Sequence, residues 1–392
     1  MSKVFGIPSN TGDLLFCECE SRRELERRIL KLFSEYGYNE IITPTLEYYE
    51  LFIKNKSFND DEMFKLTDSK NRLVVLRPDS TVPVGRIIST KLKGAAFPLR
   101  LCYDQNVFRA NSLFSLKRDE ITECGIELVG IGGIRADVEA LTLAVKAIKK
   151  AVRGGFKLEI GTANYFDALA DELSLSESEK DKIRGIIADK NFALLDTELE
   201  KYGDKARELR EMPKRFGDIS VIDGAIKSAP NEKAKDALLY LSVVCKKLAE
   251  LGYGDVIMVD LGLVNKIDYY TGIVFRGYIE SQGEAVLSGG RYDSLFEEEG
   301  VFLPAVGFSM NIDAVNSVIC KAPAVKVPDA VIFYADGFEK DAFELFASLK
   351  SEKISAELSV FDSLASTAAY CKKIKAKTLY SVTESGVKEE SF

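Results

Sequence analysis

The chain has 392 residues, which is enough for two or three domains with sizeable hydrophobic cores. Its 46% apolar and 29% charged residues are typical of water-soluble proteins, and no apolar run reaches the length of a membrane span, so we expect a cytoplasmic protein. The net charge of −8 argues against nucleic-acid binding, because surfaces that bind nucleic acid are usually basic.

Histidine and cysteine usage excludes several kinds of catalytic chemistry. The sequence contains no histidine, so this chain supplies no histidine triad, no histidine general base and no histidine metal ligand. Its seven cysteines are scattered, odd in number and include no CxxC pair. We therefore expect neither a disulfide framework nor a metal site.

The first predicted element is an amphipathic helix over residues 21–36. Ser21 and Glu24 have the spacing of a capping box, and Gly37 is suited to end the helix. Three apolar or alternating runs with turn residues between them then predict an antiparallel sheet, at residues 72–78, 98–109 and 120–130.

Helical spacing returns at residues 135–152, and Gly154 and Gly155 follow it. From Tyr165 to about Gly252 the sequence is rich in Glu, Lys, Ala and Leu, which predicts an inserted helical subdomain. Strand patterns resume afterwards, at residues 255–264, 273–280, 285–290 and 305–315.

A separate small domain is predicted at the C-terminal end. Residues 321–328 contain two prolines and read as a linker. Residues 329–392 alternate as strand, helix, strand, helix, and the polar tail after Tyr380 is expected to be frayed. Together the patterns predict an α+β protein with an antiparallel sheet, flanking helices, a helical insertion and a small C-terminal α/β domain.

Several segments resemble histidyl-tRNA synthetases and occur in the family's order. They are GYNEIITPTLEYYELF (37–52, motif 1), LRPDSTVPVGR (76–86), NVFRANSLFSLKRDEITECGIELVG (106–130, motif 2), LVNKIDYYTGIVF (263–275), GGRYDSLF (289–296) and PAVGFSMNIDAV (304–315, motif 3). The resemblance covers residues 1–320 and implies the core of a class II aminoacyl-tRNA synthetase. In that family, motif 1 usually forms a homodimer interface.

The resemblance also implies a histidine-binding pocket. An imidazole has two ring nitrogens to satisfy, and the matching partners are Glu127 and Tyr270. The sequence itself supports Glu127, because a carboxylate between the apolar neighbours of GIELVG must either be exposed or have a partner. The remaining matches are Asp79, Thr81 and Glu123 for the ammonium, Arg109 for the carboxylate, and Tyr269, Gly289, Gly290, Arg291 and Tyr292 for the pocket wall.

Positions that handle ATP in the synthetases depart from the family pattern. The arginine before the Asp-Tyr-Tyr run is Asn265, and the motif 3 arginine is Ala314. The motif 2 glutamate is Asn111, and a loop glycine is Leu116. Each lost contact to a developing negative charge lowers a rate by about 100- to 1,000-fold, so we expect no useful adenylate formation.

A sequence that keeps the histidine-pocket residues but lacks the cations for ATP chemistry resembles the family of ATP phosphoribosyltransferase regulatory subunits. The resemblance implies a non-catalytic partner of a short-form catalytic subunit, acting in the first step of histidine biosynthesis and controlled by histidine, with no cofactor. Two alternatives stay open: a divergent histidyl-tRNA synthetase and a tRNA-sensing module. Pyrophosphate exchange would favour the first, and salt-sensitive tRNA affinity the second.

Overall fold

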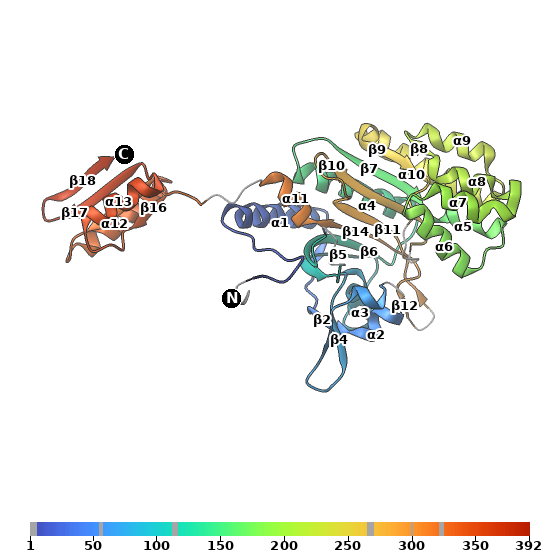
Figure 1. Cartoon of the computed structure of the whole chain (residues 1–392), viewed down its shortest axis with the longest axis horizontal. Helices are drawn as coiled ribbons and strands as arrows, with labels where there is room; N and C mark the ends of the chain where they lie inside the picture. The colour runs from blue at the N-terminus through green and yellow to red at the C-terminus, as the bar shows by residue number, and fades with distance from the viewer. Residues whose placement is uncertain (1–5, 55–57, 112–116, 265–269, 299–300, 321–324) are drawn as a thin grey trace. The chain divides into compact units, whose positions relative to one another are not determined.

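The computed structural model describes residues 6–54, 58–111, 117–264, 270–298, 301–320 and 325–392. The chain forms two compact units, one comprising Met1–Leu14 with Cys19–Lys321 and the other Leu15–Glu18 with Ala322–Phe392. Figure 1 shows the elements of each unit. Among the described residues, none of the helices is both long enough and apolar enough to cross a membrane.

The large unit is built on a nine-stranded mixed sheet. The strands stand in the order β1 (Asn39–Glu40), β5 (Leu99–Phe108), β6 (Glu120–Val129), β14 (Ala305–Asn311), β11 (Leu287–Arg291), β10 (Ile273–Ile279), β7 (Phe156–Thr162), β9 (Ile257–Asp260) and β8 (Phe216–Gly217). Neighbouring strands from β5 to β7 are antiparallel, as predicted, while β1 pairs with β5 and β9 with β7 in parallel.

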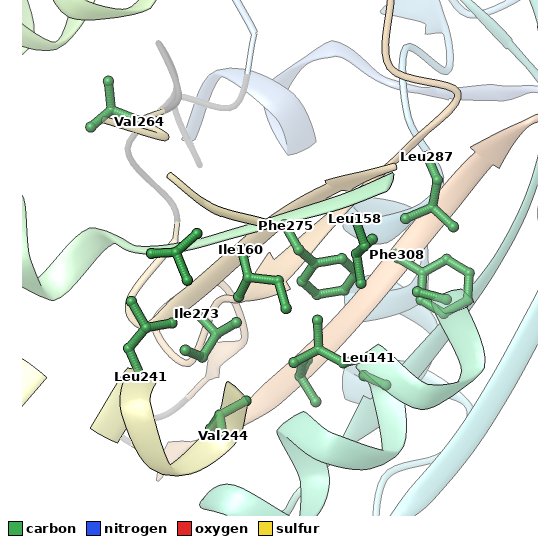
Figure 2. Packing of buried hydrophobic residues seen from close by; sticks show 14 of the residues in the cluster. Leu141, Leu158, Ile160, Leu241, Val244, Val264, Ile273, Phe275, Leu287 and Phe308 are labelled. Atoms are coloured by element: carbon green, nitrogen blue, oxygen red, sulfur yellow. The ribbon is translucent and has the colours of Figure 1, made fainter. Parts of the chain in front are cut away.

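One face of this sheet is covered by α1 (Cys17–Glu35) and α4 (Ile134–Ala151). In Figure 2, Leu141 of α4 lies with Ile160 of β7 and Phe275 of β10 in the core. The predicted capping box at Ser21 is wrong, because α1 begins four residues earlier and Ser21 lies inside it.

The other face of the sheet carries α3 (Thr81–Thr90), whose buried Val84 and Ile88 pack with Tyr103 and Tyr292. Beside it lies a three-stranded sheet in the order β2 (Leu46–Tyr48), β4 (Leu73–Leu76) and β3 (Lys65–Thr67), with α2 (Tyr49–Lys54). A small ladder pairs β12 (Glu297–Glu298) with β13 (Val301–Phe302).

Residues between β7 and β9 are mainly helical. The helices are α5 (Ala163–Glu172), α6 (Glu177–Ala188), α7 (Phe192–Leu199), α8 (Arg207–Glu211), α9 (Ser220–Ser228) and α10 (Glu232–Leu248). Helix α10 packs against α5 and also against α4 of the sheet core. The prediction of a strand over 305–315 is wrong at its end, because Asn311 caps α11 (Ile312–Ile319) by accepting from the Ala314 N–H at 2.9 Å.

The C-terminal unit contains a four-stranded sheet in the order β16 (Ala356–Leu358), β15 (Ala330–Tyr334), β17 (Thr378–Thr383) and β18 (Gly386–Ser391), with α12 (Glu339–Ser351) and α13 (Leu364–Ile374). The expectation of a frayed tail is wrong, because β18 pairs antiparallel with β17 over its whole length. All six residues of β18 are exposed, so backbone hydrogen bonds hold an edge strand whose side chains are mostly polar.

Candidate ligand-binding site

The centre of the candidate site is the carboxyl group of Glu127 on β6. It lies on the sheet face that carries α3 and is only 1% exposed. Three hydroxyls donate to it: Thr81 at 2.8 Å, Tyr103 at 3.3 Å, and Tyr292. Burial raises the pKa of Glu127 well above its usual value, and the hydroxyl of Thr81 opposes that rise. The buried glutamate predicted from the sequence therefore has polar partners.

Glycines on neighbouring strands make room for these side chains. A Cβ at Gly307 would overlap the Glu127 carboxyl group, and a Cβ at Gly290 would overlap the Tyr270 ring. Because alternate residues of a strand face opposite sides, only one glycine of the Gly289–Gly290 pair faces Tyr270. Gly289 instead meets Phe275 and Phe308, on the core side.

A second cluster of polar side chains lies near the N-terminal end of β6. Arg109 donates to Glu123 Oε1 at 2.9 Å and, through Nε, to the backbone oxygen of Pro78 at 2.8 Å. Asp79 is buried beside them and accepts from the Val82 N–H at 3.2 Å. Burial raises the pKa of Asp79 to about 7, and the Arg109 charge opposes the rise. Asp79, Thr81, Arg109, Glu123 and Glu127 thus line one face of the sheet and the start of α3.

Arg291 is buried and makes ionic contacts. Its guanidinium donates to Asp137 Oδ1 from Nε at 2.9 Å and from Nη2 at 2.6 Å, and to Asp293 from Nη1 at 2.8 Å. Tyr240 of α10 donates to the other Asp137 oxygen at 2.6 Å. Arg291 therefore links the sheet to α4 and to the helical insertion, next to the Tyr292 that contacts Glu127.

Asn111 and Ala314, which replace charged residues of the synthetases, make contacts within the protein. The Asn111 side chain donates to the backbone oxygens of Arg109 and Arg118, both at 3.0 Å. Ala314 is partly buried in the first turn of α11 and packs on the main core. The predictions for Leu116, Asn265 and Tyr269 fall outside the described residues.

Sequence reasoning missed three buried polar residues: Tyr103 and Gln105 on β5, and Ser80 between Asp79 and Thr81. Tyr103 of β5 reaches Glu127 by passing over Gly125, its direct partner in the β5–β6 ladder. Ser80 and Gln105 are 1% and 6% exposed, and within the described part of the chain Ser80 Oγ and Gln105 Nε2 have no hydrogen-bond partner. Such atoms call for a water or a ligand. The alternation of β5 could have placed Tyr103 and Gln105 on one face.

A separate cavity of about 270 Å³ lies elsewhere, between the start of α1 and the ends of β5 and β6. Its polar lining includes Arg22, Asn106, Thr122 and Asp313. Thr122 precedes Glu123 in the strand and so points to the opposite face of the sheet. Arg22 also forms an ion pair with Glu26 of the same helix at 2.7 Å. The cavity is thus distinct from the Glu127 site.

Comparison with known proteins identifies consistent similarities. A family model for histidyl-tRNA synthetase matches residues 10–315. The ATP phosphoribosyltransferase regulatory subunit of Clostridium botulinum (strain 657 / Type Ba4) is 39% identical over 376 residues, covering 94% of this chain and 89% of that protein. The subunit of the same name from Bacillus cereus (strain B4264) is 36% identical over 384 residues, covering 95% and 90%.

Solved structures agree on the fold. The ATP phosphoribosyltransferase regulatory subunit/histidyl-tRNA synthetase from Bacillus halodurans superimposes with a TM-score of 0.87 and 29% identity, covering 98% of this chain and 100% of the other. Histidyl-tRNA synthetase from Nostoc sp. PCC 7120 gives a TM-score of 0.78 at 20% identity, covering 99% and 97%. The predicted fold class is confirmed.

Proposed function

Because this chain belongs to the histidyl-tRNA synthetase family and, within it, to the ATP phosphoribosyltransferase regulatory subunits, we propose that it binds free histidine at the Glu127 site and conveys this signal to a catalytic subunit. The chain is a non-catalytic regulatory subunit of histidine biosynthesis, and the function predicted from the sequence is confirmed at this level. The ligand, its contacts and the assembly are the proposed parts.

The observation that carries the histidine proposal is the set of donors around Glu127. An ionised carboxylate has about four acceptor positions, and three hydroxyls use three of them. One position is left for a ring N–H of an imidazole. The raised pKa of Glu127 also suits this partner, since a proton can pass from the carboxyl group to the ring and leave an ion pair.

The opposite end of the ligand would lie at the second cluster of polar side chains. Glu123 and Glu127 point to the same face of β6, and four residues of extended strand separate their Cα atoms by roughly 13 Å. Their side chains can approach the two ends of one amino acid lying along the strand. Asp79 and Glu123 would hold its ammonium group, Arg109 its carboxylate, and Tyr270 the second ring nitrogen.

Control by histidine requires that the ligand bind the active and inhibited assemblies with different affinities. We propose that the catalytic partner is a short-form ATP phosphoribosyltransferase chain and that the assembly acts in the cytoplasm.

We also propose a homodimer through the motif 1 region. Support comes from the β2–β4–β3 sheet, where Leu46, Tyr48 and Leu66 share one face and are 49%, 43% and 44% exposed.

Two measurements test this function. Isothermal titration with histidine should show one binding event that weakens at least about tenfold in Glu127→Gln, because a charge-assisted hydrogen bond is lost. Glu35→Gln, an exposed carboxylate of α1, is the matched control. Co-expression with a short-form catalytic chain should give phosphoribosyl transfer from phosphoribosyl pyrophosphate to ATP, inhibited by histidine. An active mixture that histidine inhibits equally with Glu127→Gln would contradict the assigned site.

A further inference from the structure

We infer that Glu123 weakens the preference of this pocket for ligands that carry a carboxylate. Imidazole amines without a carboxylate should then bind nearly as well as histidine. The inference rests on the proposed histidine site. It concerns which chemical class the site accepts, and it assigns the specificity to one residue.

The geometry concerns Arg109, the guanidinium at the amino-acid end of the site. Its Nη2 donates to Glu123 Oε1 at 2.9 Å, and its Nε donates to the Pro78 backbone oxygen at 2.8 Å. The Glu123 side chain is 7% exposed and the Arg109 side chain 36%, so solvent reaches this ion pair from the arginine side. A ligand carboxylate that approaches Arg109 therefore meets the negative charge of Glu123 beside it.

Charge balance leads to the same result. The Asp79 and Glu123 carboxyl groups flank the single charge of Arg109, so a ligand ammonium meets two acidic groups there. The nearby Arg77 guanidinium is buried, donates to the backbone oxygens of Asn106 and Thr43, and offsets part of the charge of Glu123. The described part of the site therefore favours the amine over the carboxylate of a ligand. Glutamine at position 123 would keep the side-chain shape but remove one negative charge and release Arg109.

The test is a cycle of two ligands and two proteins. Histidine and histamine, which is histidine without its carboxylate, are titrated into the wild-type chain and into Glu123→Gln. Wild-type protein should bind histamine within about tenfold of histidine. The ratio of histamine to histidine dissociation constants should rise by about 10- to 100-fold in Glu123→Gln, since a hydrogen bond between charged groups is worth about that factor.

Two further variants make the test specific. Glu120→Gln removes an exposed carboxylate from the same strand and should leave the ratio at its wild-type value. Arg109→Met should bring the ratio close to one, because neither ligand then has a guanidinium partner. Thermal melts of each variant establish that the protein is folded.

Each outcome of the titrations decides the inference. An increased ratio in Glu123→Gln alone supports it. An unchanged ratio overturns it and places the ligand's carboxylate away from Arg109, for example at the unpaired donors of Ser80 and Gln105. If neither ligand binds the wild-type chain, the proposed histidine site is wrong as well. An unchanged ratio with clear binding contradicts only the role of Glu123.

Discussion

Gly307 lies directly opposite Glu127 in the β6–β14 ladder, and the missing side chain leaves the space that the Glu127 carboxyl group fills. A Cβ at position 307 would also approach the Tyr292 hydroxyl at 2.8 Å. The carboxyl group therefore depends on a glycine that lies 180 residues further along the chain, between residues 127 and 307. The candidate site exists because β14 pairs with β6 in this register.

Replacing Gly307 with alanine should displace Glu127 and weaken histidine binding by at least about tenfold. Overpacking of this kind costs roughly 1–3 kcal/mol of folding free energy. Titration calorimetry and urea denaturation followed by circular dichroism measure the two effects. Gly283→Ala is the control, because no atom of the described residues lies within 4 Å of its Cβ position. An unchanged affinity for histidine in Gly307→Ala would contradict the prediction, because it would show that the Glu127 carboxyl group can bind the ligand from a different position.

The pH dependence of histidine binding should contain a contribution from Asp79. Burial raises its pKa to about 7, so the carboxyl group loses its proton as the pH rises from 6 to 8 and only then attracts an ammonium group. Histidine should therefore bind more tightly at pH 8 than at pH 6. In Asp79→Asn, this part of the pH dependence should disappear. An identical pH profile in the variant would exclude Asp79 as the ammonium partner.

The folding stability of the ligand-free protein should fall as the pH rises, whereas its affinity for histidine should increase. Between the unfolded pKa near 4 and the folded pKa of about 7, folded Asp79 holds a proton that the unfolded chain has released. The contribution of Asp79 to stability is complete below this window and is lost as the pH rises through it. Urea denaturation at pH 5 and pH 7.5 should show a smaller loss of stability in Asp79→Asn than in the wild type. An equal loss in both would contradict the assignment.

The sequence predicted Glu127 for a physical reason that needs no structure: a glutamate between apolar residues requires a partner. It could not identify Tyr103, because that contact depends on which residues of β5 and β6 lie opposite each other. It also missed the role of Asp137, which lies in a helix with an ordinary amphipathic pattern and contacts Arg291 from 154 residues away. Long-range pairing of this kind has no local signal.

Local signals also failed at the C-terminal tail. The segment GVKEES is mostly polar, and a polar pattern predicts a frayed end when burial is the only criterion. Strand β18 is an edge strand whose backbone pairs with β17, and such a strand needs no apolar face. The helices of the main core were predictable because each buries one apolar face, and its strands because they are short apolar runs bounded by turn residues.

Restoring one synthetase cation should not restore synthetase chemistry. We expect Asn265→Arg to show no ATP–pyrophosphate exchange with histidine above background, because Ala314 still supplies no charge to the phosphate. Each absent contact lowers the rate by about 100- to 1,000-fold. A radiolabelled pyrophosphate assay checks this, with an active histidyl-tRNA synthetase as the positive control. Clear exchange by the single variant would mean that another group of this chain already supplies the second charge.

Removing the Asp137 carboxylate should destabilise the large unit strongly. Asp137→Ala would remove the carboxylate oxygen that accepts from two nitrogens of the buried Arg291 and leave it Asp293. Breaking a buried ion pair by removing one member costs roughly 3–5 kcal/mol, and the remaining Asp293 contact should keep the loss at the lower end of that range. Tyr240→Phe removes only a hydrogen bond to the same carboxylate and should cost about 1 kcal/mol. Urea denaturation followed by far-UV circular dichroism is suitable because the chain contains no tryptophan.

The double variant of Asp137 and Tyr240 distinguishes a linked network from two separate contacts. Since the Tyr240 hydroxyl has already lost its acceptor in Asp137→Ala, adding Tyr240→Phe should cost less than it does in the wild type. The same variants should weaken histidine binding only through Tyr292, which follows Arg291 in the chain and contacts Glu127. Full additivity of the two substitutions, or a loss below about 1 kcal/mol in Asp137→Ala, would show that this ion pair does not hold the insertion to the sheet.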